Sequence, residues 1–329
     1  MDHIAIDLGS INSQVCIRQS DGMIVQEEKV RTDCLGDLLG QLKPGRVIVE
    51  TCAESLHVVK QAKAVGHDVR LVPSTLAPEL GVGRRGIKTD IRDARHLSEA
   101  SCKIDLGSVH IPKDSSMLLK QQCGARDSRV KARTMLINTV RGWLRQSVLR
   151  PKSGVTSTLP ARVMALMESE QLDTPLHIAS LLTMITHLSE QIKAADVTLL
   201  AWCKQSELAT RLMTVPGVGP ITTVRFIASI DTVERFPNAH RVQSYLGLTP
   251  GERSSGTKQH RTGITKAGAA ATRRVLVQAA WVIKRTQKGS PLVDWNAGVE
   301  YRRGKQISAV AMARKLAGIL FVDDTRHPL

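Results

Sequence analysis

The stretch His3-Ile4-Ala5-Ile6-Asp7-Leu8-Gly9 begins the chain with a short apolar run that ends at an aspartate. Arg46-Val47-Ile48-Val49-Glu50 has the same form, and its composition is typical of a buried strand. Between them, residues 14–18 and 23–30 predict two more strands, separated by the hairpin signal Asp21-Gly22. These segments predict a meander of three strands and a later strand that can lie beside the first.

Helices alternate with strands over the rest of the first hundred residues. We expect helices over residues 35–42 and 53–65 and a strand over residues 69–72. A loop rich in Gly and Arg follows, and Thr89 after it is a suitable N-cap for a helix that extends to about Cys102. The order of these elements predicts a mixed α/β sheet.

Composition and charge limit the class of partner. The chain has 329 residues, a formal net charge of +16 and a pI of about 9.9, which favours a polyanionic partner, above all nucleic acid. Aromatic residues make up only 3%, so base recognition by stacking on an aromatic sheet is not expected. Six scattered cysteines without a CxxC pair argue against a zinc ribbon and against a secreted disulfide scaffold.

The sequence also lacks the signals of a membrane protein. No apolar run approaches the roughly 18 residues that a membrane span needs. The N-terminus has the character of a strand rather than that of a leader peptide. We therefore expect a cytoplasmic protein without a membrane partner.

The middle of the chain, residues 113–212, carries no strand signal. One stretch repeats apolar residues in alternating steps of three and four, the heptad spacing of a coiled coil. Its members are Ile178, Leu181, Ile185, Leu188, Ile192, Ala195, Leu199 and Trp202. An earlier helix carries Val130, Ile137 and Leu144 on one face, and residues 151–160 have the composition of a linker. The pattern predicts a helical hairpin that forms a coiled coil, or else an intramolecular helix bundle.

Four carboxylates occupy positions from which they could converge. Asp7 and Glu50 end two strands that can be parallel neighbours, so both side chains would emerge at one edge of the sheet. Asp90 and Asp93 lie three residues apart at the start of a predicted helix, whose N-terminus stabilises negative charge. Such oxygen ligands suit Mg²⁺ or Mn²⁺, often in a two-metal arrangement for phosphodiester chemistry. Taken singly, each could instead serve a turn, a helix start or an ion pair.

The segment that begins with the polar loop at residues 251–263 is strongly basic, and Glu252 is the only acidic residue between Gly251 and Arg274. Its basic residues are Arg253, Lys258, Arg261, Lys266, Arg273 and Arg274. We expect backbone phosphates to be attracted to it. Ser254 or Ser255 could act as a nucleophile if a base or a metal activates it. The alternative is a basic loop whose serines only bind phosphate.

Two further segments are candidates for contact with a nucleic-acid backbone. Pro216-Gly217-Val218-Gly219-Pro220 resembles the turn of a helix-hairpin-helix, in which Gly217 and Gly219 would let backbone N–H groups approach a phosphate. A simple tight turn between two helices is the alternative. Arg84 and Arg85, in the loop rich in Gly and Arg, are the second candidate.

Several short sequence motifs follow one another along the chain. They are Ile6-Asp7, Val49-Glu50-Thr51, Lys88-Thr89-Asp90-Ile91-Arg92-Asp93-Ala94, Val215-Pro216-Gly217-Val218-Gly219, Tyr245-Leu246-Gly247-Leu248-Thr249-Pro250, Ser254-Ser255-Gly256 and Thr265-Lys266-Ala267-Gly268. Together they resemble the IS110/IS1111 class of insertion-sequence transposases, the DEDD transposases, over almost the whole length. Cys52 departs from the residues that the family more often has after Glu50-Thr51, which affects only the following turn.

The resemblance implies a multi-domain fold. Residues 1–112 would form a RuvC-like α/β domain of the ribonuclease H superfamily. Residues 113–206 would form a helical coiled-coil region used in dimer or tetramer assembly, and residues 207–329 a mainly α-helical C-terminal domain. Family members recombine DNA under the guidance of a structured RNA from the element's non-coding end. The implied partners are element and target DNA, that RNA and further copies of the chain, on the nucleoid of a bacterial cytoplasm.

The resemblance also implies roles for individual residues. Asp7, Glu50, Asp90 and Asp93 would be the acidic tetrad that holds Mg²⁺ or Mn²⁺. Ser255 would be the nucleophile, because the serine of the family lies just before the glycine, and Ser254 is the less favoured neighbour. The expected activity is the cutting and rejoining of DNA strands through a covalent serine–DNA intermediate.

Two other functions stand beside this one. Asp7-Leu8-Gly9-Ser10 resembles the first phosphate loop of actin-like ATPases and sugar kinases, and Ile104-Asp105-Leu106-Gly107-Ser108 repeats the string. A non-catalytic nucleic-acid scaffold would also account for the basic charge. The acidic tetrad argues against the scaffold, and the charge of +16 argues against the kinase.

Overall fold

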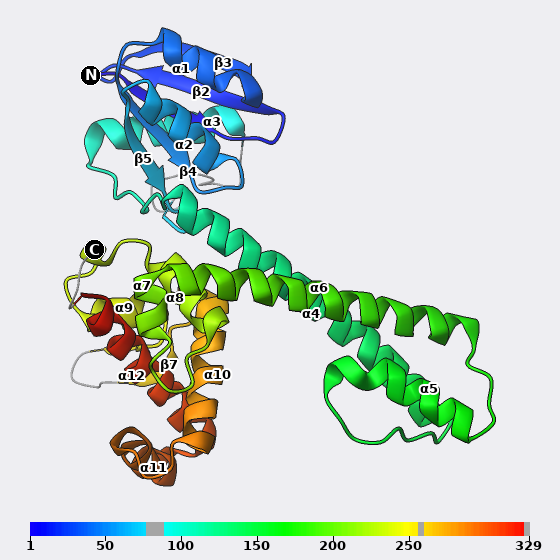
Figure 1. The fold of residues 1–329 in the computed structure, drawn as a ribbon. Helices are drawn as coiled ribbons and strands as arrows, with labels where there is room; N and C mark the ends of the chain where they lie inside the picture. Colours follow the sequence, from blue (N-terminus) through cyan, green and yellow to red (C-terminus); the bar gives the residue numbers. More distant parts are fainter. Residues whose placement is uncertain (77–88, 256–259, 326–329) are drawn as a thin grey trace. The chain divides into compact units, whose positions relative to one another are not determined.

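A computed structural model describes residues 1–76, 89–255 and 260–325 (Figure 1). The chain divides into two compact units, Met1–Ile111 and Pro112–Leu329. The three-part division expected from the sequence, with boundaries after residues 112 and 206, stays a prediction. None of the helices in the described part is both long and apolar enough to cross a membrane.

The first unit is built on a five-stranded mixed sheet with the strand order β3-β2-β1-β4-β5. The strands are β1 (His3–Asp7), β2 (Asn12–Arg18), β3 (Ile24–Arg31), β4 (Arg46–Glu50) and β5 (Asp68–Val72). Its helices are the 3-10 helix η1 (Thr32–Cys34), α1 (Leu35–Gln41), α2 (Ser55–Ala64) and α3 (Asp90–Lys103). β2 pairs antiparallel with β1 and β3, whereas β4 pairs parallel with both β1 and β5. The mixed α/β sheet that the sequence predicts is confirmed, with β1 and β4 as parallel neighbours.

Alternate residues of β1 and β4 face two different hydrophobic cores. Ile4, Ile6, Val47 and Val49 belong to a core shared with helices α1 and α2. Ala5 and Ile48 belong to a second core on the other face, which includes Leu97 of α3. Because side chains alternate along a strand, Asp7 and Glu50 continue the face that α3 covers.

An ion pair fastens α3 to the edge strand β3. The Arg95 guanidinium donates two hydrogen bonds of 2.6 Å to the Glu27 carboxylate. These hydrogen bonds lower the pKa of the Glu27 carboxyl below its ordinary value of 4.5, against the opposing effect of burial. The pair therefore stabilises the unit at neutral pH.

The substitution Glu27→Gln tests this pair. The stabilisation is present above pH 4.5 and is lost as the pH falls through the lowered pKa of the folded state. We expect Glu27→Gln to reduce the free energy of unfolding by about 0.5–1 kcal/mol at pH 7, because the pair is partly exposed. Urea unfolding should show the difference between the two proteins shrinking as the pH falls below 4.5 and through the lowered pKa of Glu27. A difference that is independent of pH would contradict this account.

The second unit is almost entirely helical. Its helices are α4 (Asp114–Gln146), α5 (Leu159–Ser169), α6 (Leu176–Gln205), α7 (Glu207–Leu212), α8 (Pro220–Ile230), α9 (Ala239–Tyr245), α10 (Ala270–Thr286), α11 (Pro291–Arg303) and α12 (Lys305–Thr325), with 3-10 turns η3 (Thr156–Thr158) and η4 (Val233–Arg235). As expected, residues 113–212, all of them described, contain no strand. The strands β6 (Pro250–Glu252) and β7 (Arg261–Ile264) form a hairpin. The sequence predicts only a polar loop there, because such short polar strands show no alternation of apolar residues.

The long helices α4 and α6 form an antiparallel hairpin. Ile137 near the C-terminal end of α4 shares a core with Ile178 and Ile185 at the start of α6. Leu119 at the other end of α4 shares a core with Leu199. The heptad positions of α6 thus face α4 of the same chain at both ends. The sequence did not predict α5, which packs into the first of these cores.

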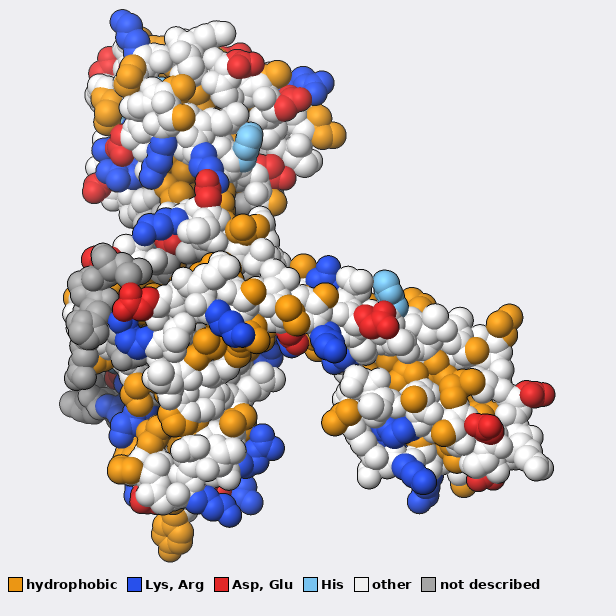
Figure 2. All heavy atoms as spheres, viewed as in Figure 1, with side chains coloured by type: hydrophobic (Ala, Val, Ile, Leu, Met, Phe, Trp, Pro, Cys, Tyr) orange, Lys and Arg blue, Asp and Glu red, His pale blue; other side chains and the backbone are white. Residues whose placement is uncertain are grey.

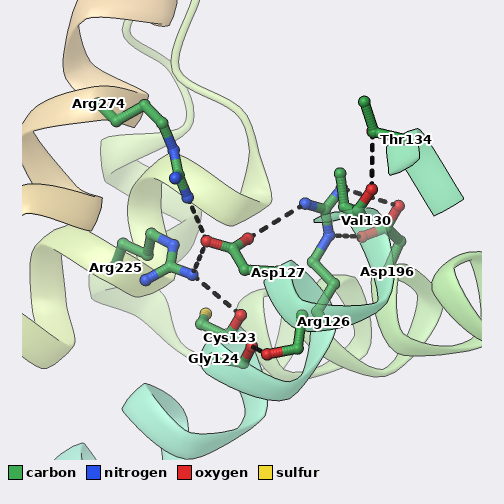
Figure 3. A network of polar contacts seen from close by, with 10 residues as sticks. Cys123, Gly124, Arg126, Asp127, Val130, Thr134, Asp196, Arg225 and Arg274 are labelled. Atoms are coloured by element: carbon green, nitrogen blue, oxygen red, sulfur yellow. Dashed lines mark hydrogen bonds and ion pairs between the residues drawn. The ribbon is translucent and has the colours of Figure 1, made fainter. Parts of the chain in front are cut away.

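A network of charged groups joins α4, α6, α8 and α10 (Figure 3). The Arg225 guanidinium, 8% exposed, contacts the Asp127 carboxylate at 2.7 Å and donates a hydrogen bond of 2.9 Å to the Cys123 carbonyl. Arg274 also donates to Asp127. Arg126 donates to Asp196 over 2.6 Å. Asp127 is the carboxylate that neutralises the buried Arg225.

Removal of Asp127 should be much more harmful than removal of Asp196. Asp127→Ala leaves Arg225 buried without its counter-ion, so we expect the free energy of unfolding to fall by about 3 kcal/mol. Asp196, whose side chain is 42% exposed, is the matched control, and Asp196→Ala should cost about 1 kcal/mol or less. Thermal unfolding of the two variants compares them directly. Equal losses would show that the buried arginine does not depend on Asp127.

Candidate active site

Two of the predicted carboxylates lie side by side at the end of the sheet. Asp7 is the last residue of β1 and Glu50 is the last residue of β4. The parallel register pairs Ile6 with Val49, so the next residues on both strands, Asp7 and Glu50, are neighbours at the carboxyl edge. This placement confirms the expected strand positions of both residues.

Helix α3 brings a third carboxylate toward this edge. It runs antiparallel to β1, because Ser101 near its C-terminal end lies 2.7 Å from Nδ1 of His3, at the start of β1. Leu97, four residues earlier, shares a core with Ala5. Four residues along a helix rise about 6 Å and two residues along a strand about 6.6 Å, so these two intervals cover nearly the same distance. Asp93 lies four residues before Leu97, and Asp7 lies two residues after Ala5. The two carboxylates are therefore expected at the same level.

The Asp93 side chain is buried, and none of the described residues forms a hydrogen bond with it. It is 2% exposed, and neither of its carboxylate oxygens has a hydrogen-bond partner in the described part of the chain. Asp90, the first residue of α3, is exposed. Thr89 is the N-cap, as predicted, and its side chain accepts a hydrogen bond from the Arg92 backbone N–H. The two aspartates therefore start one helix but occupy different environments.

The residues at this edge suit a divalent cation chemically. Carboxylate oxygens are the ligands that Mg²⁺ and Mn²⁺ prefer, and a buried carboxylate without a partner is costly unless a cation compensates it. Among the residues that the structure describes, no three His, Cys, Asp or Glu side chains converge closely enough to form a complete metal site. The assignment of Asp7, Glu50, Asp90 and Asp93 as metal ligands therefore stays a prediction.

The two candidate serines follow β6 in the second unit. The hairpin pairs Glu252 with Arg261, and the Arg253 backbone N–H donates to the His260 carbonyl over 2.9 Å. The Ser254 hydroxyl donates to the Glu252 carboxylate over 2.5 Å. Ser255 is exposed, and its hydroxyl makes no hydrogen bond to any described residue. The structure thus separates a serine held by its own hairpin from one that is accessible.

The segments that contain Gly247 and Gly268 pack against each other at the base of this hairpin. Gly247 and Gly268 both have positive φ, of +66° and +70°. A Cβ on Gly268 would lie 2.0 Å from the Tyr245 carbonyl oxygen. Arg273 fastens the same contact, because its Nη1 donates to the Leu246 carbonyl at 2.8 Å and to the Ala267 carbonyl at 2.9 Å. The contact fixes the base of the serine hairpin.

Gly268→Ala should therefore destabilise the second unit strongly. The substitution adds a steric clash to an unfavourable backbone conformation, so we expect a loss of about 2–3 kcal/mol in the free energy of unfolding. Gly289 is a matched control, because its φ is +78° but a Cβ there would meet nothing within 4 Å. Gly289→Ala should cost about 1 kcal/mol. Chemical denaturation measures both, and a loss for Gly268→Ala no larger than the control's would refute the proposed clash.

In the turn between α7 and α8, close packing requires one of the two glycines. Gly217 has φ +78°, and a Cβ there would lie 2.7 Å from Cγ1 of Ile283 on α10. A Cβ on Gly219, the N-cap of α8, would meet nothing within 4 Å. Packing against α10 therefore accounts for Gly217, while Gly219 keeps room for a ligand to approach.

The remaining basic candidates fall into two groups. Arg253, Arg261 and Lys266 are exposed on or beside the serine hairpin. Arg84, Arg85 and Lys258 lie outside the described residues. From the sequence, Arg273 and Arg274 are also expected to attract phosphates. The structure shows instead that Arg273 binds backbone carbonyls and that Arg274 binds Asp127, roles for which the sequence carries no signal.

Comparison with known proteins matches both units to one family. A family model of IS110-type DEDD transposases, described as "Transposase", matches residues 4–148. A second model, described as "Transposase IS116/IS110/IS902 family", matches residues 209–292. The two matched segments together cover more than half of the chain.

Relatives match over nearly the full length. The transposase for insertion sequence element IS1111A of Coxiella burnetii is 27% identical over 334 residues, covering 98% of this chain and 90% of the relative. A probable family 20 transposase of Pseudomonas aeruginosa is 26% identical and covers 98% of this chain and 96% of the relative. The transposase for insertion sequence element IS1328 of Yersinia enterocolitica matches with the same identity and coverage.

These matches set aside the alternatives of an ATPase and a non-catalytic scaffold. Residues 104–108, which repeat the phosphate-loop string, form neither helix nor strand, and the Ser108 hydroxyl accepts a hydrogen bond from the Leu71 backbone of β5. Gly9, in the first copy, lies in the tight turn from β1 to β2. The chain belongs to the IS110/IS1111 family of insertion-sequence transposases, enzymes that cut DNA strands and rejoin them.

Proposed function

We propose that this transposase cuts and rejoins DNA with Ser255 as nucleophile and with the acidic residues Asp7, Glu50, Asp90 and Asp93 as metal ligands. The observation that carries the proposal is the buried carboxylate of Asp93, which has no hydrogen-bond partner in the described part of the chain and belongs to the helix turn nearest the ends of β1 and β4. Proteins retain such a group where it serves a function.

The family depends on a divalent metal ion, and Mg²⁺ or Mn²⁺ suits these ligands. When bound, such an ion would stabilise charge on the scissile phosphate as a Lewis acid. Asp7 and Glu50 would hold it from the sheet and Asp93 from the helix. Asp90, exposed at the N-terminus of α3, would complete the set from the solvent side.

The serine step conserves the energy of the phosphodiester bond. The Ser255 Oγ attacks phosphorus, an Oγ–P bond forms, and the bond from phosphorus to the 3′ oxygen breaks. The serine proton is lost, and the departing 3′ oxygen gains a proton to become a 3′-hydroxyl. A 3′-hydroxyl of a partner strand then attacks the serine ester, and the serine is restored. No ATP is needed, because the covalent intermediate retains the bond energy.

Exposed cations around the serine would position the DNA backbone. Arg253, Arg261 and Lys266 are accessible in the structure, and Lys258, Arg84 and Arg85 are further candidates from the sequence. Gly219 at the start of α8 is the candidate backbone contact in the turn of the second unit. Such contacts position a nucleic acid without reading its bases.

The choice of target and the assembly belong to the same proposal. A guide RNA from the element would pair with donor and target DNA, which accounts for a strongly basic chain with few aromatic residues. The hairpin of α4 and α6 would contribute surfaces through which two or four copies assemble. The enzyme would act in the bacterial cytoplasm, on the nucleoid.

The test is a reconstituted reaction. The full chain is incubated with labelled donor and target DNA, in the presence and absence of Mg²⁺ and of RNA transcribed from the element's non-coding end. We expect an SDS-resistant protein–DNA adduct that requires both. Cleavage without any adduct would show hydrolysis by water instead of serine attack, and an adduct that forms equally without RNA would refute guidance.

A further inference from the structure

The far end of the α4–α6 hairpin holds an unusual concentration of positive charge. Residues 128–167 contain eight Lys and Arg residues and no Asp or Glu, so this segment supplies half of the chain's formal net charge of +16. Figure 2 shows Lys and Arg side chains on the lobe that α5 forms. From sequence alone, this region is expected to form only a helix and a linker.

Five of these cations surround a single cleft. The linker after α4 folds back beside the start of α5 and borders an open cleft with a volume of about 630 Å³. The cleft is bordered by Arg141, Arg145, Arg150, Lys152 and Arg162. Within the described part of the chain, no carboxylate forms an ion pair with any of the five. Like charges that are held together in this way favour a polyanion as ligand.

The cleft is shaped by specific contacts. The Arg162 guanidinium donates to the Thr158 hydroxyl at 3.1 Å, to the Val155 carbonyl at 3.0 Å and to the Lys152 carbonyl. These hydrogen bonds hold the linker in place as one wall of the cleft. They also occupy donors of Arg162 that could otherwise bind a ligand. Arg141, Arg145, Arg150 and Lys152 are exposed at the rim, so their charges are available to a ligand.

The lining is apolar as well as basic. Leu144 and Leu159, each 2% exposed, and the partly buried Leu149 line it together with Pro151. An apolar lining with a cationic rim suits a nucleotide, whose base and sugar can enter while the phosphate stays at the rim. The volume is that of a small-ligand pocket, so a whole duplex could touch only the rim.

We propose that this cleft binds the phosphate backbone of one nucleic-acid strand, through residues other than those of the serine hairpin and of the acidic edge of the sheet. The site gives the transposase a second binding contact with its nucleic acid, at the tip of the helical hairpin. It does not depend on the assignments of Ser255 or of the metal ligands.

The test compares two pairs of charge reversals in the full chain. Arg145→Glu with Arg150→Glu alters the cleft, and Lys193→Glu with Lys204→Glu on α6 is the control with the same change in net charge. All four side chains are exposed, so both variants should fold, which circular dichroism and thermal unfolding verify. Fluorescence anisotropy measures binding of single-stranded RNA, single-stranded DNA and duplex DNA of equal length, at several salt concentrations.

We expect the cleft variant to bind single strands at least tenfold more weakly than the control variant does. The slope of log affinity against log salt should fall by about 1.4, because two phosphate contacts at about 0.7 each are lost. A greater loss for RNA identifies an RNA strand as the occupant, and a greater loss for DNA identifies a DNA strand. Equal weakening by both variants, or a loss confined to duplex DNA, would overturn the proposal.

Photocrosslinking provides the second readout. Single strands that carry 4-thiouridine or 4-thiothymidine should crosslink to peptides from residues 141–162 of the wild-type chain, as mass spectrometry identifies them. Crosslinks found only in other parts of the chain would overturn the proposal even if affinity falls. The adduct assay for Ser255 reads a different step, so failure of the serine proposal and failure of the cleft can be told apart.

Discussion

Replacing Ser255 with alanine is expected to abolish the covalent protein–DNA product, with a loss of at least about a thousandfold in strand cleavage. The substitution removes the oxygen that would bond to phosphorus, and no other group can form that ester at the same position. Ser255 is exposed and makes no hydrogen bond to the described residues, so the fold and DNA binding should be unchanged. Gel electrophoresis in SDS measures the adduct, and a binding assay shows that the DNA is still held.

Ser254→Ala is the matched control for this result. The Ser254 hydroxyl donates to Glu252 within the same hairpin, so its removal should alter the turn slightly and leave most of the adduct. If Ser254→Ala loses the adduct and Ser255→Ala keeps it, the nucleophile is the neighbouring serine, activated by Glu252. If both variants keep it, the serine mechanism fails.

The second large effect is expected for Asp93→Asn. The amide cannot supply the anionic ligand that a metal site needs, so cleavage should fall by about a thousandfold, equal to about 4 kcal/mol of transition-state stabilisation. The stability of the fold should change in the opposite direction. A buried carboxylate without a partner is costly, so without added metal Asp93→Asn should raise the free energy of unfolding by about 1 kcal/mol.

Two measurements separate a metal ligand from a merely buried residue. Added Mg²⁺ should raise the melting temperature of the wild-type chain but not that of Asp93→Asn, because only the ligand couples metal binding to folding. Asp90→Asn is the control for burial. Asp90 is exposed, so its stability without metal should change by no more than about 0.5 kcal/mol. If Asp93→Asn unfolds more easily and stays active, the carboxylate is structural.

The sheet was predictable from sequence because its strands carry strong local signals. Ile4–Ile6 and Val47–Val49 are short apolar runs bounded by polar residues, and Thr89 marks the start of α3 by capping chemistry. The same signals placed Asp7 and Glu50 at strand ends, because each carboxylate interrupts an apolar run. The burial of Asp93 and the exposure of Asp90 depend on which side of α3 faces the sheet, which the two aspartates alone do not reveal.

The second unit was less predictable because its contacts are formed between segments far apart in sequence. Gly217 looked like a residue that admits a phosphate, yet the side chain that a Cβ would strike is Ile283 on α10. Arg273 and Arg274 looked like phosphate ligands, yet their partners are carbonyl groups and Asp127. Local composition cannot distinguish a cation that binds a ligand from one that fastens the fold.

The most direct test of the account is to locate the covalent bond itself. The adduct formed by the wild-type chain with Mg²⁺, RNA and DNA is digested with nuclease and protease, and mass spectrometry maps the residue that retains a nucleotide. We expect a nucleotide linked to Ser255 through its 5′-phosphate, and no such adduct from Asp93→Asn. A nucleotide on another residue, or cleaved DNA with no modified peptide, would contradict it.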